Sequence, residues 1–380
     1  MLTYLDHHAS TPCDSAVVEA MAPWWSANCA NPSARLHRPG LEAAAALEVA
    51  RGRLARVLGS RPEAVVFVSG ATEANNLALK GVVEAARQRG EPRRQLLSLV
   101  SEHRAVLEPL AWLERQGTPV QLLPVGPDGL LDLAVLEAAL TPDTLLLSVM
   151  AANNEIGVLQ DLTAIAALCR RHGVLLHCDA AQAAGHLPLA MEQIGIDLLS
   201  LSGHKCYGPK GIGALLVRPE VPLAAQQLGG GQEGGRRAGT AAVPLIVGLG
   251  VALEQAAADQ QERGARLAGL RDTLWQGLEA LGGIRRNGHP SRCLPHNLNV
   301  TVSGVDGNRL HSLLRRRLAV GSGSACSEGQ PSHVLAALGL SRAEAQASIR
   351  FGLGRDSNAA DVATAVAAVA DALAQLRRAD

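Results

Sequence analysis

Between residues 61 and 217 the chain repeats one unit: a short run of aliphatic and β-branched residues, a turn, and an amphipathic helical pattern. Strands that alternate with helices in this way predict a parallel sheet covered by helices. Six runs carry the pattern: Val65–Val68, Leu96–Val100, Leu145–Met150, Val174–Cys178, Leu198–Leu201 and Ile212–Val217. The alternation therefore restricts the chain to an α/β fold, with a mainly parallel sheet and helices on both faces.

Beyond residue 217 the alternation stops. A glycine-rich stretch at 229–235 predicts a mobile loop, because its composition disfavours regular structure. Pro244–Leu281 then reads as a long helical region. Strand candidates follow at Asn297–Val302 and Ser348–Phe351, with helices between and after them. The C-terminal part therefore predicts a second, smaller α+β domain.

We place the domain division at the edges of these patterns. Residues 14–257 are expected to form the large α/β domain, and residues 1–13 with 258–380 the small one. Leu41–Arg56 and Asp361–Arg378 read as alanine-rich helices. A chain of 380 residues with 47% hydrophobic content is long enough to bury a sizeable core.

The charge balance limits the classes of partner. Lysine plus arginine and aspartate plus glutamate both number 35, so no broad field favours nucleic acid or an anionic membrane surface. The N-terminus lacks a basic segment followed by an apolar run, and no stretch of about 18 uninterrupted apolar residues occurs. We therefore expect a cytoplasmic protein that acts on small molecules or protein partners and binds neither nucleic acid nor membrane.

The cysteine pattern argues against structural crosslinks. The seven cysteines are Cys13, Cys29, Cys169, Cys178, Cys206, Cys293 and Cys326. They are odd in number, widely scattered and never form a C-x-x-C pair, so neither a disulfide framework nor a structural zinc site is expected.

Lysine is rare, since only Lys80, Lys205 and Lys210 occur. This matters because an amine forms an imine with a carbonyl cofactor, whereas arginine does not. Lys80 falls in a helical pattern where a solvated face is expected, and Lys210 falls in a turn. Lys205 follows a buried type of strand beside His204, where partial desolvation would lower its pKa. It is the favoured imine former, with an ordinary surface lysine as the alternative reading.

Polar groups follow five consecutive predicted strands. They are Ser69-Gly70-Ala71-Thr72-Glu73, Ser101-Glu102-His103, Asn153-Asn154-Glu155, Asp179-Ala180-Ala181-Gln182 and Ser202-Gly203-His204-Lys205. Ligands of open α/β sheets bind beyond the carboxyl ends of the strands, so this shared position predicts a single site.

Two parts of this site suit a phosphorylated pyridine cofactor. The turn at Ala71 and Thr72 runs into a helix and offers free N–H groups to a phosphate, with further hydrogen bonds from Ser202 and His204, although such a turn is more often a plain helix cap. Asp179 ends a buried strand, and a buried carboxylate needs a compensating charge. A protonated pyridine nitrogen is one such partner, and an arginine is the alternative.

Cys326 lies among the glycines and serines of residues 321–330, a composition that predicts a loop. Most free cysteines are buried and inert. A cysteine on a polar loop is exposed and is able to react as a thiolate. The other six cysteines sit mainly in apolar or helical contexts, although Cys29 and Cys206 have polar neighbours.

Together these motifs resemble the pyridoxal-phosphate-dependent cysteine desulfurases of the NifS/IscS type, within the class V aminotransferase superfamily. The resemblance covers nearly the whole chain and implies the fold type I of pyridoxal-phosphate-dependent transferases. Four of the five strand ends carry it, all but the one at Asp179, and the Asn153 motif continues through Ile156-Gly157. The other motifs are Tyr4-Leu5-Asp6, Thr11-Pro12, Asn31-Pro32-Ser33, Arg237-Ala238-Gly239-Thr240, Ser322-Gly323-Ser324-Ala325-Cys326 and Ser348-Ile349-Arg350-Phe351.

The resemblance implies that pyridoxal 5'-phosphate is the cofactor and that Lys205 bonds to it covalently. The other implied cofactor contacts are His103 stacked on the ring, Asp179 at the pyridinium nitrogen, Gln182 at the ring oxygen, Asn154 beside the ring, and Ala71, Thr72, Ser202 and His204 at the phosphate. Thr240 would reach this phosphate from the other subunit of a homodimer. Asn31 and Arg350 would bind the substrate carboxylate, for which a guanidinium fork is well suited.

The implied reaction converts L-cysteine to L-alanine. Cysteine displaces Lys205 from the cofactor, the freed amine takes the Cα proton, and Cys326 attacks the substrate sulfur to become a persulfide. The sulfur would pass to an iron–sulfur scaffold or a tRNA-thiolation relay, for which a mobile loop is a sensible carrier. No resident metal is expected, with transient ligation of a nascent iron–sulfur cluster by Cys326 as the one exception considered.

Three departures from the family pattern stand out. The loop after Cys326 looks short, Gly234 replaces a usual arginine, and Asp6-His7-His8-Ala9-Ser10 differs from the usual N-terminal motif. They bear on the choice of partner and on rate more than on the type of reaction.

Two alternative functions stay open. A sister enzyme on the same fold would act on selenocysteine or cysteine sulfinate, without needing Cys326 as nucleophile. A non-catalytic sulfur carrier would keep the fold and use Cys326 only as an acceptor, although intact Lys205, His103 and Asp179 argue against it.

Overall fold

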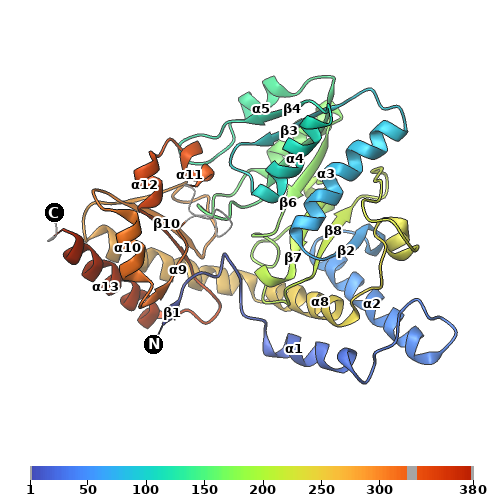
Figure 1. The fold of residues 1–380 in the computed structure, drawn as a ribbon, viewed down its shortest axis with the longest axis horizontal. Helices are drawn as coiled ribbons and strands as arrows, with labels where there is room; N and C mark the ends of the chain where they lie inside the picture. The colour runs from blue at the N-terminus through green and yellow to red at the C-terminus, as the bar shows by residue number, and fades with distance from the viewer. Residues whose placement is uncertain (1, 323–331, 378–380) are drawn as a thin grey trace.

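The structure is a computed structural model that describes residues 2–322 and 332–377, and a seven-stranded sheet forms its centre (Figure 1). The order across the sheet is β2-β8-β7-β6-β5-β3-β4. The strands are β2 Val65–Val68, β3 Gln95–Leu99, β4 Val120–Leu123, β5 Thr144–Met150, β6 Leu175–Asp179, β7 Leu198–Ser202 and β8 Gly213–Val217. The six runs read from the sequence agree with these bounds to within one residue at each end.

Strand β8 runs antiparallel to both of its neighbours, β2 and β7, whereas the other strands of this sheet share one direction. Its sequence was grouped with the parallel runs, and the structure corrects that grouping. Only residues 203–212 connect β7 to β8. A parallel return requires a crossover of about a dozen residues or more, so this short link turns the chain back beside β7.

Helices cover both faces of the sheet because its strands are apolar on both sides. In β2, Val66 and Val68 pack on one face with α3 and α4. Val65 and Phe67 pack on the other face with α2, α5, α6 and α8. These helices are α2 Arg38–Val57, α3 Ala71–Gln88, α4 Arg104–Arg115, α5 Leu133–Ala139, α6 Leu162–His172 and α8 Val243–Ala258. The expected mainly parallel α/β architecture is confirmed.

The edge strand β4 was not foreseen. Its central residues Gln121 and Leu122 are exposed, because an edge strand has only one neighbour and little cover. No continuous apolar run or clean alternation therefore marks it in the sequence.

A smaller antiparallel sheet has the order β12-β10-β9, and β1 pairs with β11 beside it. Its strands are β1 Thr3–Tyr4, β9 Ile284–Arg286, β10 Asn297–Val302, β11 Leu318–Ala319 and β12 Ser348–Gly352. Helices α9 Gln260–Glu279, α10 Gly307–Leu314 and α13 Ala359–Leu376 pack with these strands in one apolar cluster. The remaining helices are α1 Ser15–Met21, α7 Met191–Ile194, α11 His333–Ala337 and α12 Arg342–Gln346. The division into residues 14–257 and the remainder stays a prediction.

Two C-terminal expectations need correction. The helical region Pro244–Leu281 is two helices, α8 and α9, separated at Asp259, whose ψ of 6° is not helical. The glycine-rich stretch contains a short 3-10 turn at Gln232–Gly235. The buried Glu233 carboxylate fixes this turn, because it accepts hydrogen bonds from Arg51 at 3.0 Å and from the Phe67 N–H at 2.9 Å. Gly234, which replaces a usual arginine, has a φ of +64° that favours glycine.

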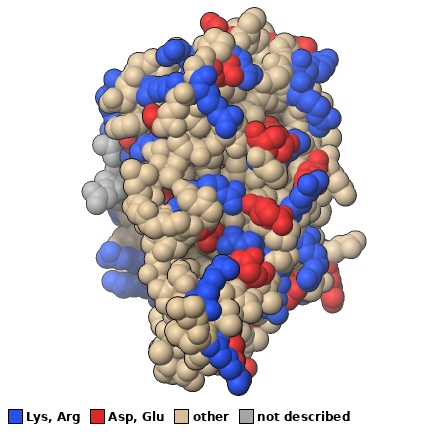
Figure 2. Space-filling view, turned by 90° about the vertical axis from the view of Figure 1, so that its right-hand side faces the viewer, with Lys and Arg blue, Asp and Glu red and all other residues tan. Residues whose placement is uncertain are grey.

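Helix α13 is long and apolar enough, by length and composition, to cross a membrane. Its apolar side chains, among them Val369 and Leu373, pack instead in the core of the smaller sheet. On the molecular face in Figure 2, basic and acidic side chains are interspersed instead of gathering by sign.

Candidate active site

A cavity of about 470 Å³ opens where the parallel strands of the large sheet end. Its lining includes ten of the residues expected at the site, contributed by segments far apart in the sequence. They are Ala71, Thr72, His103, Asn154, Asp179, Gln182, Ser202, His204, Lys205 and Arg350. Because the carboxyl ends of parallel strands share one edge of the sheet, reasoning from strand ends located this site.

Three expected site residues do not belong to this lining. Asn31 lies in an exposed turn, and Thr240 is exposed beyond the glycine-rich stretch. Cys326 lies outside the described residues.

Lys205 ends a 3-10 turn, Gly203–Lys205, that follows β7 directly. Its Nζ donates hydrogen bonds to the carbonyl oxygens of His8 and Ala9, the latter at 3.0 Å. Lys80 lies outside the cavity, with its Nζ 4.6 Å from the ring centroid of Trp112 instead of on a fully solvated face. Lys210 lines the cavity from an exposed position. Of the three lysines, Lys205 is the one that lies on the cavity wall and is partly buried.

Asp179 is the last residue of β6, and only 5% of its surface is exposed. Its Oδ2 accepts a hydrogen bond from Asn75 Nδ2 at 2.7 Å, and its Oδ1 accepts one from the Ala181 N–H at 2.9 Å. Both donors are neutral, and among the described residues no arginine forms an ion pair with Asp179. The arginine alternative is therefore wrong, and a cationic ligand group would supply the compensating charge.

His103 caps the N-terminus of α4, where its Nδ1 accepts a hydrogen bond from the Ala105 N–H at 3.1 Å. An accepting Nδ1 places the ring proton of neutral histidine on Nε2. Burial lowers the pKa of His103, which favours this neutral form. The neighbouring Glu102 is fully buried, and burial raises the pKa of its carboxyl group.

The phosphate corner lies at the start of α3. The N-cap residue of this helix is Gly70, which has no side chain to accept a hydrogen bond from the first N–H groups. Ala71 and Thr72, which carry these N–H groups, line the cavity, so the groups are available to a phosphate. Ser202 and His204 line the same cavity. Burial, followed by the charge of Lys205, lowers the pKa of His204 to about 4, so His204 is a neutral donor near pH 7.

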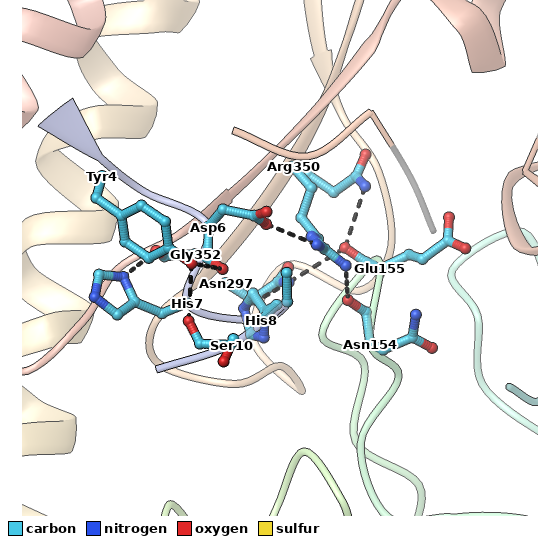
Figure 3. Close-up of polar contacts among 12 residues, drawn as sticks. Tyr4, Asp6, His7, His8, Ser10, Asn154, Glu155, Asn297, Arg350 and Gly352 are labelled. Atoms are coloured by element: carbon cyan, nitrogen blue, oxygen red, sulfur yellow. Dashed lines mark hydrogen bonds and ion pairs between the residues drawn. The ribbon is translucent and has the colours of Figure 1, made fainter. Parts of the chain in front are cut away.

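Arg350 and Asn154 form the opposite end of the cavity, and Figure 3 shows Arg350 between Asp6 and Asn154. Arg350 Nη2 pairs with Asp6 Oδ1 at 2.8 Å, and Nη1 donates to the Asn154 carbonyl oxygen at 2.8 Å. Arg350 Nε and Asn154 Oδ1 are buried and have no hydrogen-bond partner among the described residues. These atoms are suited to a polar ligand, because unpaired buried polar groups are costly.

The N-terminal residues His8, Ala9 and Ser10 also line the cavity, although sequence reasoning assigned them no role. In the sequence, the only sign that this segment is special was its departure from the usual N-terminal motif. His8 and His7 pack tightly against Gly352, the last residue of β12, and Gly354, just after it. A Cβ atom at Gly352 would lie 2.7 Å from His8 Cδ2, and one at Gly354 would overlap the His7 ring.

Asn75, whose side-chain amide donates a hydrogen bond to Asp179, is the other site residue that sequence reasoning did not identify. A fully buried asparagine on the apolar side of α3 was the available signal.

The arrangement fits pyridoxal phosphate. It offers an amine on Lys205, a buried Asp179 carboxylate held by two neutral donors, a free helix start at Ala71 and unpaired polar atoms on Asn154 and Arg350. An imine-forming amine facing an acid at the ring nitrogen is the pairing this cofactor requires. Among the described residues no group of three or more side chains is placed to hold a metal ion.

Comparison with known proteins adds independent findings. The family model described as Aminotransferase class-V matches residues 3–364. The chain is 46% identical over 378 residues to the cysteine desulfurase IscS of Methylococcus capsulatus, covering 98% of this chain and 93% of that relative. It is 42% identical over 380 residues to the IscS of Klebsiella pneumoniae, with the same coverage.

Solved structures give the same result. A NifS-like protein superposes with a TM-score of 0.92 at 34% identity, covering 99% of this chain and 100% of the other. SspA in complex with cysteine gives 0.81 at 38% identity, covering 92% and 98%. DndA from Streptomyces lividans gives 0.78 at 36% identity, covering 92% and 99%. Both comparisons agree with the resemblance found in the sequence motifs.

Proposed function

Since this chain belongs to the class-V aminotransferase family and is a pyridoxal-phosphate-dependent cysteine desulfurase of the NifS/IscS type, we propose that Lys205, His103 and Cys326 divide its reaction among them. The reaction takes sulfur from L-cysteine, leaves L-alanine and hands the sulfur to an acceptor protein. The observation that carries the proposal is the convergence of Lys205, His103 and Asp179 on one cavity.

When bound, pyridoxal phosphate supplies an electron sink for the negative charge that develops at the substrate Cα. We assign Lys205 as its covalent attachment and Asp179 as the partner of its ring nitrogen. The other assigned contacts are His103 and Asn154 at the ring, Gln182 at the ring oxygen, and Ala71, Thr72, Ser202 and His204 at the phosphate. The lining of the cavity by all of these residues supports the assignment.

We assign the proton transfers of the reaction to two groups on the cavity wall. Lys205 Nζ, once the substrate amine has taken its place, accepts the proton that leaves Cα. His103 keeps its own proton on Nε2 because its Nδ1 is occupied by the Ala105 N–H, so it serves as the proton donor at the opposite side. Arg350 orients the substrate by its carboxylate, through the buried Nε that has no protein partner among the described residues.

Sulfur transfer falls to Cys326, which lies outside the described residues. Its thiolate attacks the substrate sulfur, so a new S–S bond forms while the Cβ–S bond of the substrate breaks. The electron pair of the broken bond stays on the substrate carbon and takes up a proton. The products are alanine and a persulfide on Cys326.

We further propose a homodimer. Thr240, to which we assign a contact with the cofactor phosphate, lies outside the cavity of its own chain, and so does Asn31. A second copy that brings Thr240 to the cavity would account for its contact. Leu36 and Leu228, which flank these residues in the sequence, are 102% and 85% exposed, as expected of side chains that another subunit covers. In this arrangement Thr240 of one copy reaches the phosphate of the other.

The physiological acceptor is proposed to be an iron–sulfur scaffold or a tRNA-thiolation relay in the cytoplasm. Similarity to relatives named IscS supports the first of these. Transient ligation of a nascent iron–sulfur cluster by Cys326 would accompany that role.

The test compares wild-type protein with Cys326→Ala in L-cysteine and a thiol reductant. Equal release of alanine and sulfide by the wild type, abolished by the substitution, is the expected result. Cys29→Ser is the matched control, because Cys29 is exposed and lies outside the cavity. No product from the cofactor-loaded wild type would overturn the proposal. Activity on selenocysteine or cysteine sulfinate that survives Cys326→Ala would favour the sister enzymes.

A further inference from the structure

Three buried histidines, His8, His296 and His186, stack ring upon ring behind the cavity. The ring centroids of His8 and His296 are 4.6 Å apart with planes 19° from parallel, and those of His296 and His186 are 4.4 Å apart with planes 28° from parallel. The three residues are 1%, 3% and 8% exposed. His8 comes from the N-terminus, His186 from the segment after β6 and His296 from the segment before β10, so only tertiary structure brings them together.

Both ends of this histidine stack touch Lys205. At one end, His186 Nε2 donates to the backbone carbonyl oxygen of Lys205 at 2.9 Å. At the other end, the backbone carbonyl oxygen of His8 accepts a hydrogen bond from Lys205 Nζ. The stack therefore contacts the lysine at its main chain and at its amine.

The side chain of His8 is fixed on both ring nitrogens. Asn297 Nδ2 donates to His8 Nε2 at 3.0 Å, so Nδ1 carries the proton and donates to Gln182 Oε1 at 3.0 Å. Gln182 Nε2 in turn donates to the His8 carbonyl oxygen at 3.0 Å. Figure 3 shows His8 beside Asn297. The ring thereby holds in place the carbonyl group that Lys205 Nζ contacts.

The other end of the stack is braced as well. Tyr207, two residues after Lys205, lies 6.3 Å from His186 between ring centroids and has a φ of +63°, which is uncommon for a residue with a side chain. Its N–H donates to Thr11 Oγ1 at 2.8 Å, and its hydroxyl accepts a hydrogen bond from the Arg355 N–H at 2.7 Å. The segment that carries Lys205 is thus held from both sides.

Burial lowers the pKa of all three histidines, that of His186 to about 4. The rings are neutral near pH 7, so they stack without mutual repulsion. A neutral His186 with its proton on Nε2 is also the form that donates to the Lys205 carbonyl.

We propose that His8 and His186, braced by His296, are positioning residues that set the place of the Lys205 amine in the cavity. Their rings act through Lys205, because that of His186 contacts the Lys205 main-chain carbonyl and that of His8 fixes the carbonyl oxygen that accepts from Lys205 Nζ. The role rests on the proposed function of Lys205 as the covalent attachment of the cofactor. Displacement of a reacting amine by about 1 Å is enough to slow a reaction substantially.

The test follows covalent attachment of pyridoxal phosphate to Lys205 in the full-length chain after the cofactor has been removed. Attachment is timed by absorbance, trapped with borohydride and located by peptide mass. His186→Leu removes the donor to the Lys205 carbonyl and should slow attachment about tenfold. His186→Gln places an amide N–H near the position of Nε2 and should restore the rate to within about twofold of wild type.

His311→Leu is the matched control. His311 Nε2 also donates to a backbone carbonyl, that of Ser348 at 3.0 Å, but it lies away from the cavity. Its loss should leave the attachment rate unchanged. His8→Ala gives a second variant in case His186→Leu fails to fold, because it keeps the His8 carbonyl and removes only the ring. It should slow attachment about fivefold.

Wild-type attachment rates in both His186→Leu and His8→Ala would overturn the proposal, as would an equal slowing by His311→Leu. Slowing in the first two variants, with rescue by His186→Gln, would support it. The assay contains no cysteine, so its outcome is separate from that of alanine release. A wild-type chain that attaches no cofactor at Lys205 would instead overturn the proposed function.

Discussion

Asp179 ends β6 with a buried carboxylate whose hydrogen-bond donors are the neutral Asn75 amide and the Ala181 N–H. Asp179→Asn keeps the shape of the side chain and removes its charge. The cofactor ring nitrogen then loses its partner, and we expect kcat for alanine release to fall by about 100-fold or more. Steady-state alanine formation measures this.

Asp197→Asn is the control for loss of a partly buried carboxylate. Asp197 accepts from the Leu176 N–H at 2.8 Å and pairs with Arg218, but it does not line the cavity. We expect its kcat to remain near the wild-type value. An Asp179→Asn variant within twofold of wild type would contradict the assigned role.

His177 is a fully buried residue of β6, bonded to Ser148 Oγ at 2.8 Å and to Ser200 Oγ at 2.9 Å. Burial lowers its pKa from 6.5 to about 4, so between these values the unfolded chain binds a proton that the folded chain excludes. This residue's contribution to stability is present above about pH 6.5 and is lost as the pH falls toward 4, by about 1.4 kcal/mol per pH unit.

Replacing His177 with Gln should therefore reduce the acid sensitivity of folding. The difference in free energy of unfolding between wild type and variant should shrink by up to about 3 kcal/mol from pH 7 to pH 4. Urea denaturation at several pH values measures it. His172→Gln, at an exposed histidine, corrects for the change in net charge. A difference that stays constant with pH would contradict the assignment.

At the scale of elements, helix α11 is held by a side chain at its first turn. Ser332 Oγ accepts from the Leu335 N–H at 3.1 Å and donates to the buried Glu155 carboxylate. Ser332→Ala removes the cap and deprives a buried acid of its donor, so the free energy of unfolding should fall by about 1–3 kcal/mol. Ser332→Thr, which keeps the hydroxyl, should recover most of it. Chemical denaturation followed by circular dichroism measures both.

Ser341→Ala is the comparison for a cap without a buried partner. Ser341 caps α12 in an exposed capping box with Glu344. Its loss should cost about 1 kcal/mol or less. Equal losses at the two serines would show that the Glu155 contact contributes nothing.

The elements that the sequence predicted well are those whose burial is uniform. Strands β2 and β5 are buried along their whole length, so β2 appears as a continuous apolar run and β5 as one interrupted only by Ser148 after Thr144. Strand β4 is half exposed, and β1 and β11 have two residues each, so no local pattern marks them. The direction of β8 depends on the length of its connection to β7, which apolar runs do not encode.

The same distinction holds for the candidate site. His103 follows the buried strand β3 and Asp179 ends the buried strand β6, so position in the sequence predicted their position in space. His8 and Asn75 reach the site through packing between distant segments, which leaves no local signal. The proposed contact of Thr240 with a second copy is not encoded by any local sequence pattern.

At the scale of the whole molecule, the exposed leucines near Asn31 and Thr240 bear on assembly. Leu36→Glu combined with Leu228→Glu places charge where a second copy is proposed to pack. We expect the molecular mass in solution to fall from that of a dimer to that of a monomer. Alanine release should fall with it, because we propose that Thr240 is supplied across the interface. Size-exclusion chromatography with light scattering measures the mass.

Leu122→Glu is the control for adding charge at an exposed leucine, since Leu122 lies on the edge strand β4 at the far end of the sheet from β2. It should leave the mass unchanged. A wild-type protein of monomeric mass would contradict the dimer and the role given to Thr240.

The close packing of His7 and His8 against Gly354 and Gly352 constrains the order in which this lineage can change. A Cβ atom at either glycine would collide with an imidazole ring. At Gly354 the nearest atoms all belong to the His7 ring, so a side chain there is accessible only after His7 has become smaller. At Gly352 the backbone nitrogens of His8 and His7 lie 2.9 and 3.1 Å from the Cβ position, so a smaller histidine replacement alone does not make room for a side chain. The N-terminal motif and the end of β12, although separated by more than 300 positions, should for this reason be inherited together, with position 7 changing before position 354.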